Sequence, residues 1–433
     1  MRVLIITSSN PEKTSGRVAI DFMNALKIHD VEVKVLTKKH GVYLDKSISY
    51  VENRFESYRK WLLVLPSRLI NRILRTFNLS FISKTDSKYC DHGFDIRKTE
   101  FSTGRIIAEV SDFSPDAIII MFMQNFITFQ NLFELQKIYN VPIFIYLMDM
   151  APMTGGCHYA WNCVGYKFNC GSCPALYSQN PSDQSAINFS YKKDLVTRGD
   201  FVPIAASSWQ KQQLENSSLF RHSKKGFILS PTDENLFKPV LKVDARSAFH
   251  IDQDKKVIFL GSVNYASERK GSKEAVMALK HLSNIMSIEE RSNVLILVSG
   301  SLKPTYEDFG FKVKFVGNLD YNSLVMAYNA STLFLNSSIE DSGPTMINQS
   351  IMCGTPVVCF EMGVAADLVI NGETGYVAKL RNTMDLVNGI LSILELGDLE
   401  YERYCQNCRN IAIDKCGLKS TGFSFINLYG SVK

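Results

Sequence analysis

The densest group of metal-ligating side chains in the sequence is a cysteine-rich segment over positions 154–174. Its four cysteines are Cys157, Cys163, Cys170 and Cys173. Four thiolates can hold zinc tetrahedrally, although the first pair is spaced more widely than in a usual zinc knuckle. The segment therefore predicts either a structural zinc site or a reduced loop that forms transient disulfides. Because four cysteine ligands leave no open coordination position, we do not expect a catalytic zinc.

Two titratable residues near this segment could act on a hydroxyl group. Asp149 directly follows the apolar run PIFIYLM, and His158 lies inside the cysteine-rich segment. Either side chain could orient a hydroxyl or accept its proton near neutral pH. The alternatives are that Asp149 caps the loop that follows it and that His158 is a structural residue.

A second candidate site lies in IEDSGPTMINQSIMCGTPVV, over 339–358. A loop of small residues that leads into a helix presents backbone N–H groups and a positive dipole end, which favours phosphate binding. Gly343 would let a ligand approach the backbone closely. Arg269 and Lys270 stay charged at neutral pH and suit phosphate too, unless they form an exposed pair at a helix start.

Alternating strand and helix patterns must position these residues. MRVLIIT predicts a strand, and VAIDFMNALKIHD predicts a helix from the spacing of its apolar residues. Further strands are expected at VEVKVLT, AIIIMFM and PIFIYLM, and the alternation restarts after PTDENLFKP. Near-continuous apolar strands are typical of a parallel sheet covered on both faces. The pattern predicts two α/β halves joined near residue 230.

The loop before the first predicted helix is SSNPEKTSGRVA, which places Gly16 and Arg17 at the mouth of the first strand–helix turn. This loop is not a GxGxxG sequence. A dinucleotide-binding oxidoreductase therefore has no sequence fingerprint here.

Length and charge narrow the class of protein. A chain of 433 residues suits two domains. The net charge of +5 is small for this length and does not favour nucleic acid as a general partner. The first apolar run is too short for a signal peptide, and no apolar stretch is long enough to span a bilayer. We expect a cytoplasmic protein, whose thiols stay reduced.

An insertion at about 50–100 interrupts the first α/β half. Its segment 54–75 carries six basic residues, interleaved with leucine, isoleucine and one tryptophan. A basic amphipathic helix of this kind suits the surface of an anionic membrane. The alternative is a helical insertion that packs its leucines on the first domain.

Six segments of the chain, in order, resemble motifs of the retaining glycosyltransferase family 4. They are SGRVAIDFMNAL, PIAASSWQKQQL, PTDENLFKP, GSVNYASERKGSKEAVMAL, IEDSGPTMINQSIMCGTPVV and GVAADLVINGETGYVA. The resemblance covers nearly the whole chain. It implies the GT-B fold, which is two Rossmann-like α/β domains facing a cleft. The sugar-nucleotide donor would bind mainly to the C-terminal domain and the acceptor to the N-terminal domain.

By position, the resemblance implies that Lys270 binds the donor pyrophosphate with Arg269 beside it. Glu340 would contact the transferred sugar, although it could also be a solvated loop acid. The donor-binding residues implied are Gly16, Arg17, Arg269, Lys270, Ser342, Gly343, Pro344, Thr345, Met346 and Gln349.

Three departures from the family pattern bear on this assignment. Gln349 stands where relatives use a second glutamate on the ribose, and the basic residue that often follows the FLG strand is missing. Met148 stands where relatives place a histidine beside the reacting sugar. The catalytic candidates are therefore Asp149, His158 and Glu340.

The expected protein is a retaining glycosyltransferase that moves a sugar from a nucleotide-sugar donor to a saccharide or lipid-linked saccharide acceptor, in surface polysaccharide biosynthesis. Its expected domains are an acceptor domain over 1–228, a donor domain over 229–415, and a helix over 416–433 that packs back on the first domain. Catalysis would require no cofactor. The alternative is a catalytically weak relative that binds sugar nucleotide or glycan. The small charge and the two α/β halves disfavour a zinc-stapled nucleic-acid binder.

Overall fold

The computed structural model describes most of the chain. The described ranges are 1–11, 16–39, 47–52, 86–90, 95–97, 99–261, 267–300 and 310–433. The predicted basic helix at 54–75 lies outside these residues, so its membrane role stays a prediction.

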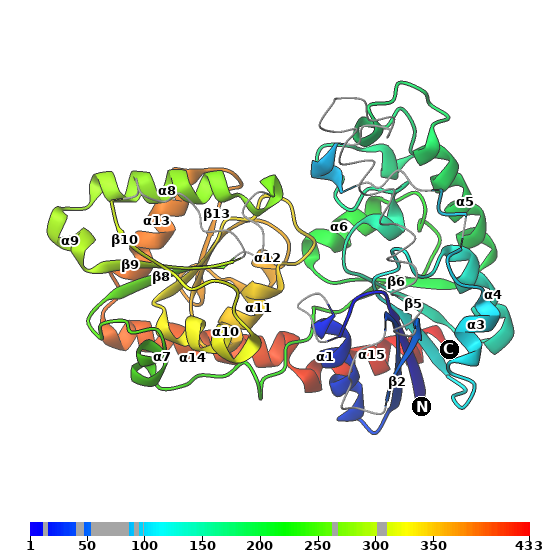
Figure 1. The fold of residues 1–433 in the computed structure, drawn as a ribbon, viewed down its shortest axis with the longest axis horizontal. Coiled ribbons are helices and arrows are strands. Elements are labelled where there is room, and N and C mark those ends of the chain that lie inside the picture. The colour runs from blue at the N-terminus through cyan, green and yellow to red at the C-terminus, as the bar shows by residue number, and fades with distance from the viewer. Residues whose placement is uncertain are drawn as a thin grey trace. The chain divides into compact units, whose positions relative to one another are not determined.

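The chain forms two compact units (Figure 1). The N-terminal unit comprises Met1–Ala205, Gln213–Gly226 and Phe425–Lys433, and the C-terminal unit comprises Ala206–Gln212 and Phe227–Ser424. The chain passes from the N-terminal unit into the main part of the C-terminal unit after Gly226, two residues before the expected domain boundary at 228. The last nine residues belong to the N-terminal unit.

A seven-stranded sheet in the order β3-β2-β1-β4-β5-β6-β7 forms the centre of the N-terminal unit. Neighbouring strands from β3 to β6 run parallel. The strands are β1 (Arg2–Thr7), β2 (Glu32–Lys39), β3 (Ile48–Glu52), β4 (Ala117–Ile120), β5 (Ile143–Leu147), β6 (Phe201–Ala205) and β7 (Gly226–Phe227). The helices are α1 (Arg17–Lys27), α3 (Thr103–Ala108), α4 (Phe129–Tyr139), α5 (Gln184–Arg198) and α6 (Ser208–Asn216). Short 3-10 helices are η1 (Ser87–Tyr89), η2 (Ala151–Met153), η3 (Gly165–Lys167) and η4 (Pro174–Leu176).

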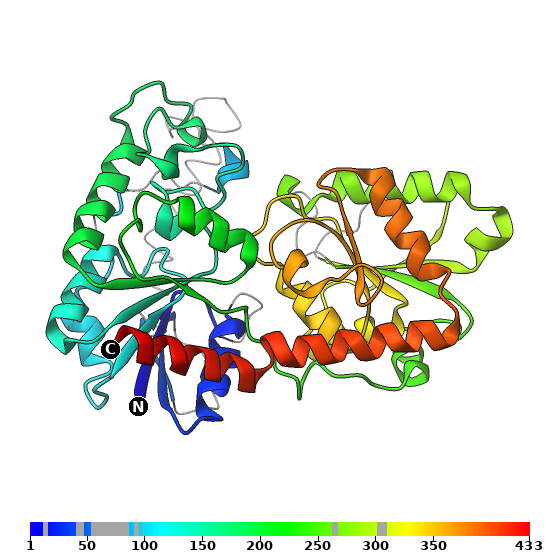
Figure 2. The same ribbon diagram turned by 180° about the vertical axis from the view of Figure 1, so that it is seen from behind.

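Strand β5 shows why both faces of this sheet are covered. Phe144 packs edge-on against Phe425 of the C-terminal helix, with 5.0 Å between ring centroids. The next residue, Ile145, belongs to a core cluster with Leu132 of α4 and Phe189 of α5. Because successive side chains of a strand point to opposite faces, an entirely apolar strand requires helices on both sides. Figures 1 and 2 show these two helical layers.

The C-terminal unit repeats this architecture around a six-stranded parallel sheet in the order β10-β9-β8-β11-β12-β13. Its strands are β8 (Lys256–Gly261), β9 (Val294–Ser299), β10 (Lys312–Phe315), β11 (Leu333–Asn336), β12 (Val357–Phe360) and β13 (Gly375–Ala378). Its helices are α7 (Lys242–Ala248), η5 (Glu268–Lys270), α8 (Ser272–Ile285), α9 (Ile288–Ser292), α10 (Tyr321–Ala330), α11 (Thr345–Met352), α12 (Ala365–Leu368), α13 (Thr383–Leu394) and α14 (Asp398–Cys416). A final helix, α15 (Leu418–Val432), follows α14.

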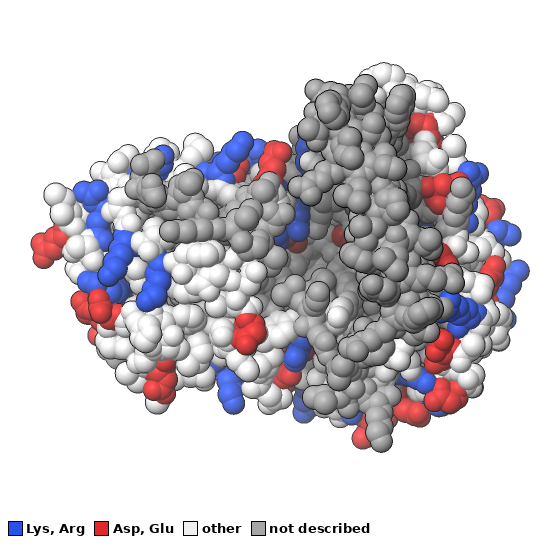
Figure 3. All heavy atoms as spheres, in the orientation of Figure 1, with Lys and Arg blue, Asp and Glu red and all other residues white. Residues whose placement is uncertain are grey.

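The surface offers no obvious single-sign field on the face drawn in Figure 3, where basic and acidic side chains of the described residues are interspersed. This agrees with the small net charge of +5. Among the described residues, no helix is both long and apolar enough to cross a membrane.

Candidate functional site

The turn that carries Arg269 and Lys270 meets the loop after β11 because β8 and β11 are parallel neighbours. Both segments leave the sheet at the carboxyl edge, where open α/β folds place their ligands. The backbone N–H of Ile339 donates to the Arg269 carbonyl at 2.8 Å, and the Ser337 hydroxyl donates to the Lys270 carbonyl at 3.0 Å. The two segments are thus held together by the backbone as well as by side chains.

Gly271 permits this close approach. Its φ is +64°, and a Cβ at this position would lie 1.7 Å from the Ser337 carbonyl oxygen. Only glycine adopts this conformation without strain and leaves room for the neighbouring backbone. The RKG turn therefore has a steric reason for its glycine.

The two cations converge on a single carboxylate. Arg269 Nη1 donates to Asp341 Oδ2 at 2.6 Å, and Lys270 Nζ donates to the same oxygen at 2.8 Å. The Asp341 side chain is only 10% exposed, whereas the side chains of Arg269 and Lys270 are 21% and 27% exposed. Burial alone would raise the pKa of Asp341, but Lys270 and Arg269 lower it to about 2. The carboxylate is therefore ionised at neutral pH.

Helix α11 begins directly after this loop. Its N-cap is Pro344, which supplies no side-chain cap, and its first turn contains no acidic residue. Backbone N–H groups and the positive end of the helix dipole can therefore serve an anion. At Gly343 a Cβ would have room, with the Ala206 carbonyl oxygen at 3.9 Å, so the protein itself does not require glycine there.

Two further predicted site residues, the catalytic candidate Glu340 and the donor-binding candidate Gln349, are buried here. Glu340 is 7% exposed, and Gln349 of α11 is 9% exposed. The hydroxyl of the fully buried Tyr328 donates to Gln349 Oε1 at 3.2 Å. The Gln349 amide thus uses its oxygen within the core, and its NH₂ group is the donor that could face a ligand.

In the N-terminal unit, Asp149 and His158 are in direct contact. His158 Nδ1 lies 2.8 Å from Asp149 Oδ2, and Gln124 Nε2 donates to the same oxygen at 3.2 Å. Asp149 Oδ1 also accepts the N–H of Ala151 at 2.8 Å, so the loop-capping role and the histidine contact coexist. With the ring proton on Nδ1 toward the carboxylate, Nε2 carries the lone pair that can accept a proton.

A cavity of about 500 Å³ adjoins this pair within the N-terminal unit. Gln124, His158 and the buried Lys192 line it, together with Phe126 and Phe129. Lys192 Nζ donates to the carbonyls of residues 151 and 154, both at 2.7 Å, and so fixes the loop that carries His158. Polar groups at the wall of a partly aromatic, open-sided cavity are typical of a binding site for an organic ligand.

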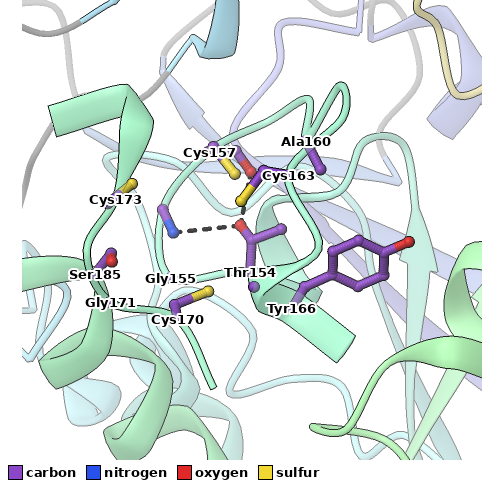
Figure 4. Close-up of a pocket in the computed structure, with 12 residues that line it drawn as sticks. Thr154, Gly155, Cys157, Ala160, Cys163, Tyr166, Cys170, Gly171, Cys173 and Ser185 are labelled. Carbon is purple, nitrogen blue, oxygen red and sulfur yellow. Dashed lines mark hydrogen bonds between the residues drawn. The ribbon is translucent and has the colours of Figure 1, made fainter. Parts of the chain in front are cut away.

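The four cysteines line one small cavity of about 20 Å³ (Figure 4). None of the four forms a disulfide, and burial raises the pKa of Cys170 to about 12. Gly155 and Gly171 let the loop fold tightly, since a Cβ at either would lie within 2.3 Å of a carbonyl oxygen. Over the described residues, no three His, Cys, Asp or Glu side chains lie close enough to share a metal ion.

Comparison with known proteins finds a family whose model matches part of the C-terminal unit. Residues 244–412 match the family described as glycosyl transferases group 1. A stretch of 99 residues is 25% identical to the uncharacterized glycosyltransferase MJ1069 of Methanocaldococcus jannaschii, covering 23% of this chain and 25% of that protein.

Solved structures resemble the whole chain in fold. Sucrose-phosphate synthase (tll1590) from Thermosynechococcus elongatus superposes with a TM-score of 0.67 at 15% identity, covering 100% of this chain and 98% of that one. Anabaena Alr3699/HepE, in complex with UDP and glucose, superposes with a TM-score of 0.61 at 17% identity, with full coverage of both chains. The predicted GT-B fold is confirmed.

In the N-terminal unit, two predicted donor-binding residues, Gly16 and Arg17, lie at the start of α1. A Cβ at Gly16 would lie 1.9 Å from the Asn10 carbonyl oxygen, so the turn needs glycine. Arg17 Nε donates to Asp21 Oδ1 at 2.6 Å, one turn further along the helix. Their contact with a donor stays a prediction.

Asp341 and Gln124 are the site residues that sequence reasoning missed. Asp341 follows Glu340 directly in the segment that resembles the family motif. Because a buried carboxylate needs a cation beside it, an aspartate next to a predicted phosphate-binding loop indicates that the nearby arginine and lysine pair with it. Gln124 follows β4, and β4 is the parallel neighbour of β5, which precedes Asp149. Because ligand-binding residues of α/β folds follow the carboxyl ends of neighbouring strands, the position of Gln124 after β4 could have indicated that it lies near Asp149.

Proposed function

We propose that this protein is a retaining glycosyltransferase that moves a sugar from a nucleotide-sugar donor to a saccharide or lipid-linked saccharide acceptor. The observation that carries the proposal is the convergence of Arg269 and Lys270, at 2.6 and 2.8 Å from one oxygen, beside the N-terminal end of α11. Two cations and a helix end are what a diphosphate requires. The HepE neighbour, which binds UDP and glucose, supports a donor of this class.

In this proposal the C-terminal unit stabilises the leaving group. Negative charge builds up on the diphosphate as the bond to the sugar breaks, and fixed cations and N–H groups stabilise that charge. Glu340 would hold the transferred sugar, and the backbone of residues 342–346 would hold sugar and phosphate. Gln349 would donate its amide to the ribose. No protein nucleophile takes part: the acceptor oxygen bonds to the sugar carbon on the face from which the diphosphate leaves, and the departing phosphate receives the proton of the acceptor hydroxyl.

The cavity beside His158 would hold the acceptor. Asp149 and Gln124 fix the imidazole, and the imidazole would orient the acceptor hydroxyl. His158 would thereby take over from the histidine that relatives carry at the position of Met148. Positioning of this kind is worth orders of magnitude in rate without any change in the chemical step.

We further propose a role in surface polysaccharide biosynthesis, on the cytoplasmic side of a membrane that the segment 54–75 contacts. A structural zinc in the cysteine-rich segment stays a prediction that would require its thiols to move closer together, since no three of these described thiols, as placed, could share an ion; catalysis would require no cofactor. Metal analysis of the purified chain tests the zinc site: about one zinc per chain supports the site, and none supports a reduced loop.

A donor screen that follows diphosphate release, with and without saccharide acceptors, tests the central proposal. Turnover with one donor that depends on an acceptor is the expected result. Binding of nucleotide sugars without turnover of any donor would instead favour a catalytically weak relative. Met148 and Gln349, which replace family residues, are the observations that favour this second candidate.

A further inference from the structure

The Asp341 carboxylate lies where a donor diphosphate would need its cations. We propose that Asp341 is a positioning residue that competes with the diphosphate for Arg269 and Lys270 and so limits how tightly the site holds it. The inference rests on the proposed function of these two cations as the diphosphate clamp. The role of Asp341 would be to assist release of the diphosphate.

The contacts show that Asp341 engages both cations at once. A single oxygen, Oδ2, accepts from Arg269 and Lys270, while Oδ1 accepts the N–H of Gly343 at 3.2 Å. The N–H of Asp341 is directed to Met362 Sδ at 3.3 Å, which fixes the backbone of the residue. The carboxylate is therefore held by its own loop as well as by the two cations.

The charges of Arg269, Lys270 and Asp341 explain why competition between Asp341 and the diphosphate would favour release of the product. Arg269 and Lys270 together carry two positive charges, and Asp341 cancels one of them. Once the departed diphosphate has released the acceptor's proton to water, it carries more negative charge than the same diphosphate esterified to a sugar. An uncompensated pair of cations would therefore hold the product more tightly than the donor. A fixed carboxylate offers the cations an alternative partner as the product departs.

Isothermal titration of the full chain with inorganic pyrophosphate, at one ionic strength, tests the proposal. Asp341→Asn removes the charge, and we expect pyrophosphate to bind about tenfold more tightly, because one repulsive unit charge beside the ligand is lost. Glu268→Gln is the matched control: it removes an exposed acid from the same turn and is expected to leave the affinity unchanged.

Asp341→Ser is a second variant that tests the proposal if Asp341→Asn does not fold. Serine is neutral and small, and its hydroxyl can still accept the N–H of Gly343, so we expect the same gain in affinity. Equal or weaker binding of pyrophosphate by folded Asp341→Asn and Asp341→Ser overturns the proposal. A merely structural aspartate would weaken binding when removed and could not strengthen it.

Arg269→Gln and Lys270→Gln separate this inference from the proposed function. If both variants lose affinity for pyrophosphate while Asp341→Asn fails to gain it, only the role of Asp341 is wrong. If pyrophosphate binds the wild-type chain and neither variant weakens it, the diphosphate clamp itself is wrong.

Discussion

At the scale of single residues, Lys270 has the most direct expected effect on activity. Lys270→Ala removes a cation from the leaving diphosphate, so we expect the rate of sugar transfer to fall on the order of 10²-fold. Lys273→Ala, which changes an exposed lysine at the start of α8, is the control and should keep the wild-type rate. Unchanged turnover in Lys270→Ala would contradict the assignment of the clamp.

His158 should affect the acceptor and not the donor. In His158→Gln we expect kcat to fall on the order of 10²-fold with the KM for the donor unchanged, because the imidazole acts on the acceptor hydroxyl. His222→Gln changes an exposed histidine of the same unit and should have no effect. A rise in donor KM with unchanged kcat would place His158 elsewhere in the mechanism.

Asp341 should make the free energy of unfolding of the protein depend on pH in the acidic range. Its pKa is lowered to about 2 in the folded protein, below the roughly 3.9 of an unfolded aspartate. Its stabilising contribution is therefore complete above the unfolded pKa and is lost as the pH falls toward the folded pKa. In urea unfolding, the difference in free energy between wild type and Asp341→Asn should narrow as the pH is lowered from about 6 to about 3. A difference that is constant over this range would contradict the ion-paired state.

At the scale of elements, helix α15 contributes to the core of the N-terminal unit although it follows the C-terminal unit in sequence. Phe425 is fully buried and packs against Phe22 and Phe144, with centroid distances of 5.7 and 5.0 Å. We expect Phe425→Ala to lower the free energy of unfolding by about 3–5 kcal/mol, measured in urea.

Phe423 of the same helix provides the matched control for this prediction, because it is 58% exposed. Phe423→Ala should cost about 0.5 kcal/mol or less. Equal losses in the two variants would mean that α15 does not supply the core of the N-terminal unit.

At the scale of the whole molecule, two separate cores predict two unfolding transitions. The proposed diphosphate site lies within the C-terminal unit, so pyrophosphate should raise the midpoint of only one transition. Phe425→Ala should lower the midpoint of the other. Calorimetric scans of wild type and variant, with and without pyrophosphate, check both effects. A shift of both transitions by pyrophosphate alone would contradict this localisation.

Much of the fold could be predicted because its signals are local. The strand MRVLIIT and the helix after it were predicted from apolar spacing, and both appear as β1 and α1. Strands β3 and β7 were not predicted, since β7 has only two residues and carries no periodic pattern. Short edge strands depend on the neighbours that pair with them, and those neighbours are distant in sequence.

By itself, the sequence determined the fold class, the family motif and the residue types that can bind phosphate, because turns, helix starts and apolar periodicity act over a few residues. Only the tertiary structure decided which of these residues meet. Arg269 and Lys270 reach Asp341 across more than 70 positions because β8 and β11 became neighbours. Gln124 reaches Asp149 because β4 and β5 did. Strand order is set by the packing of the whole sheet, which no local pattern encodes.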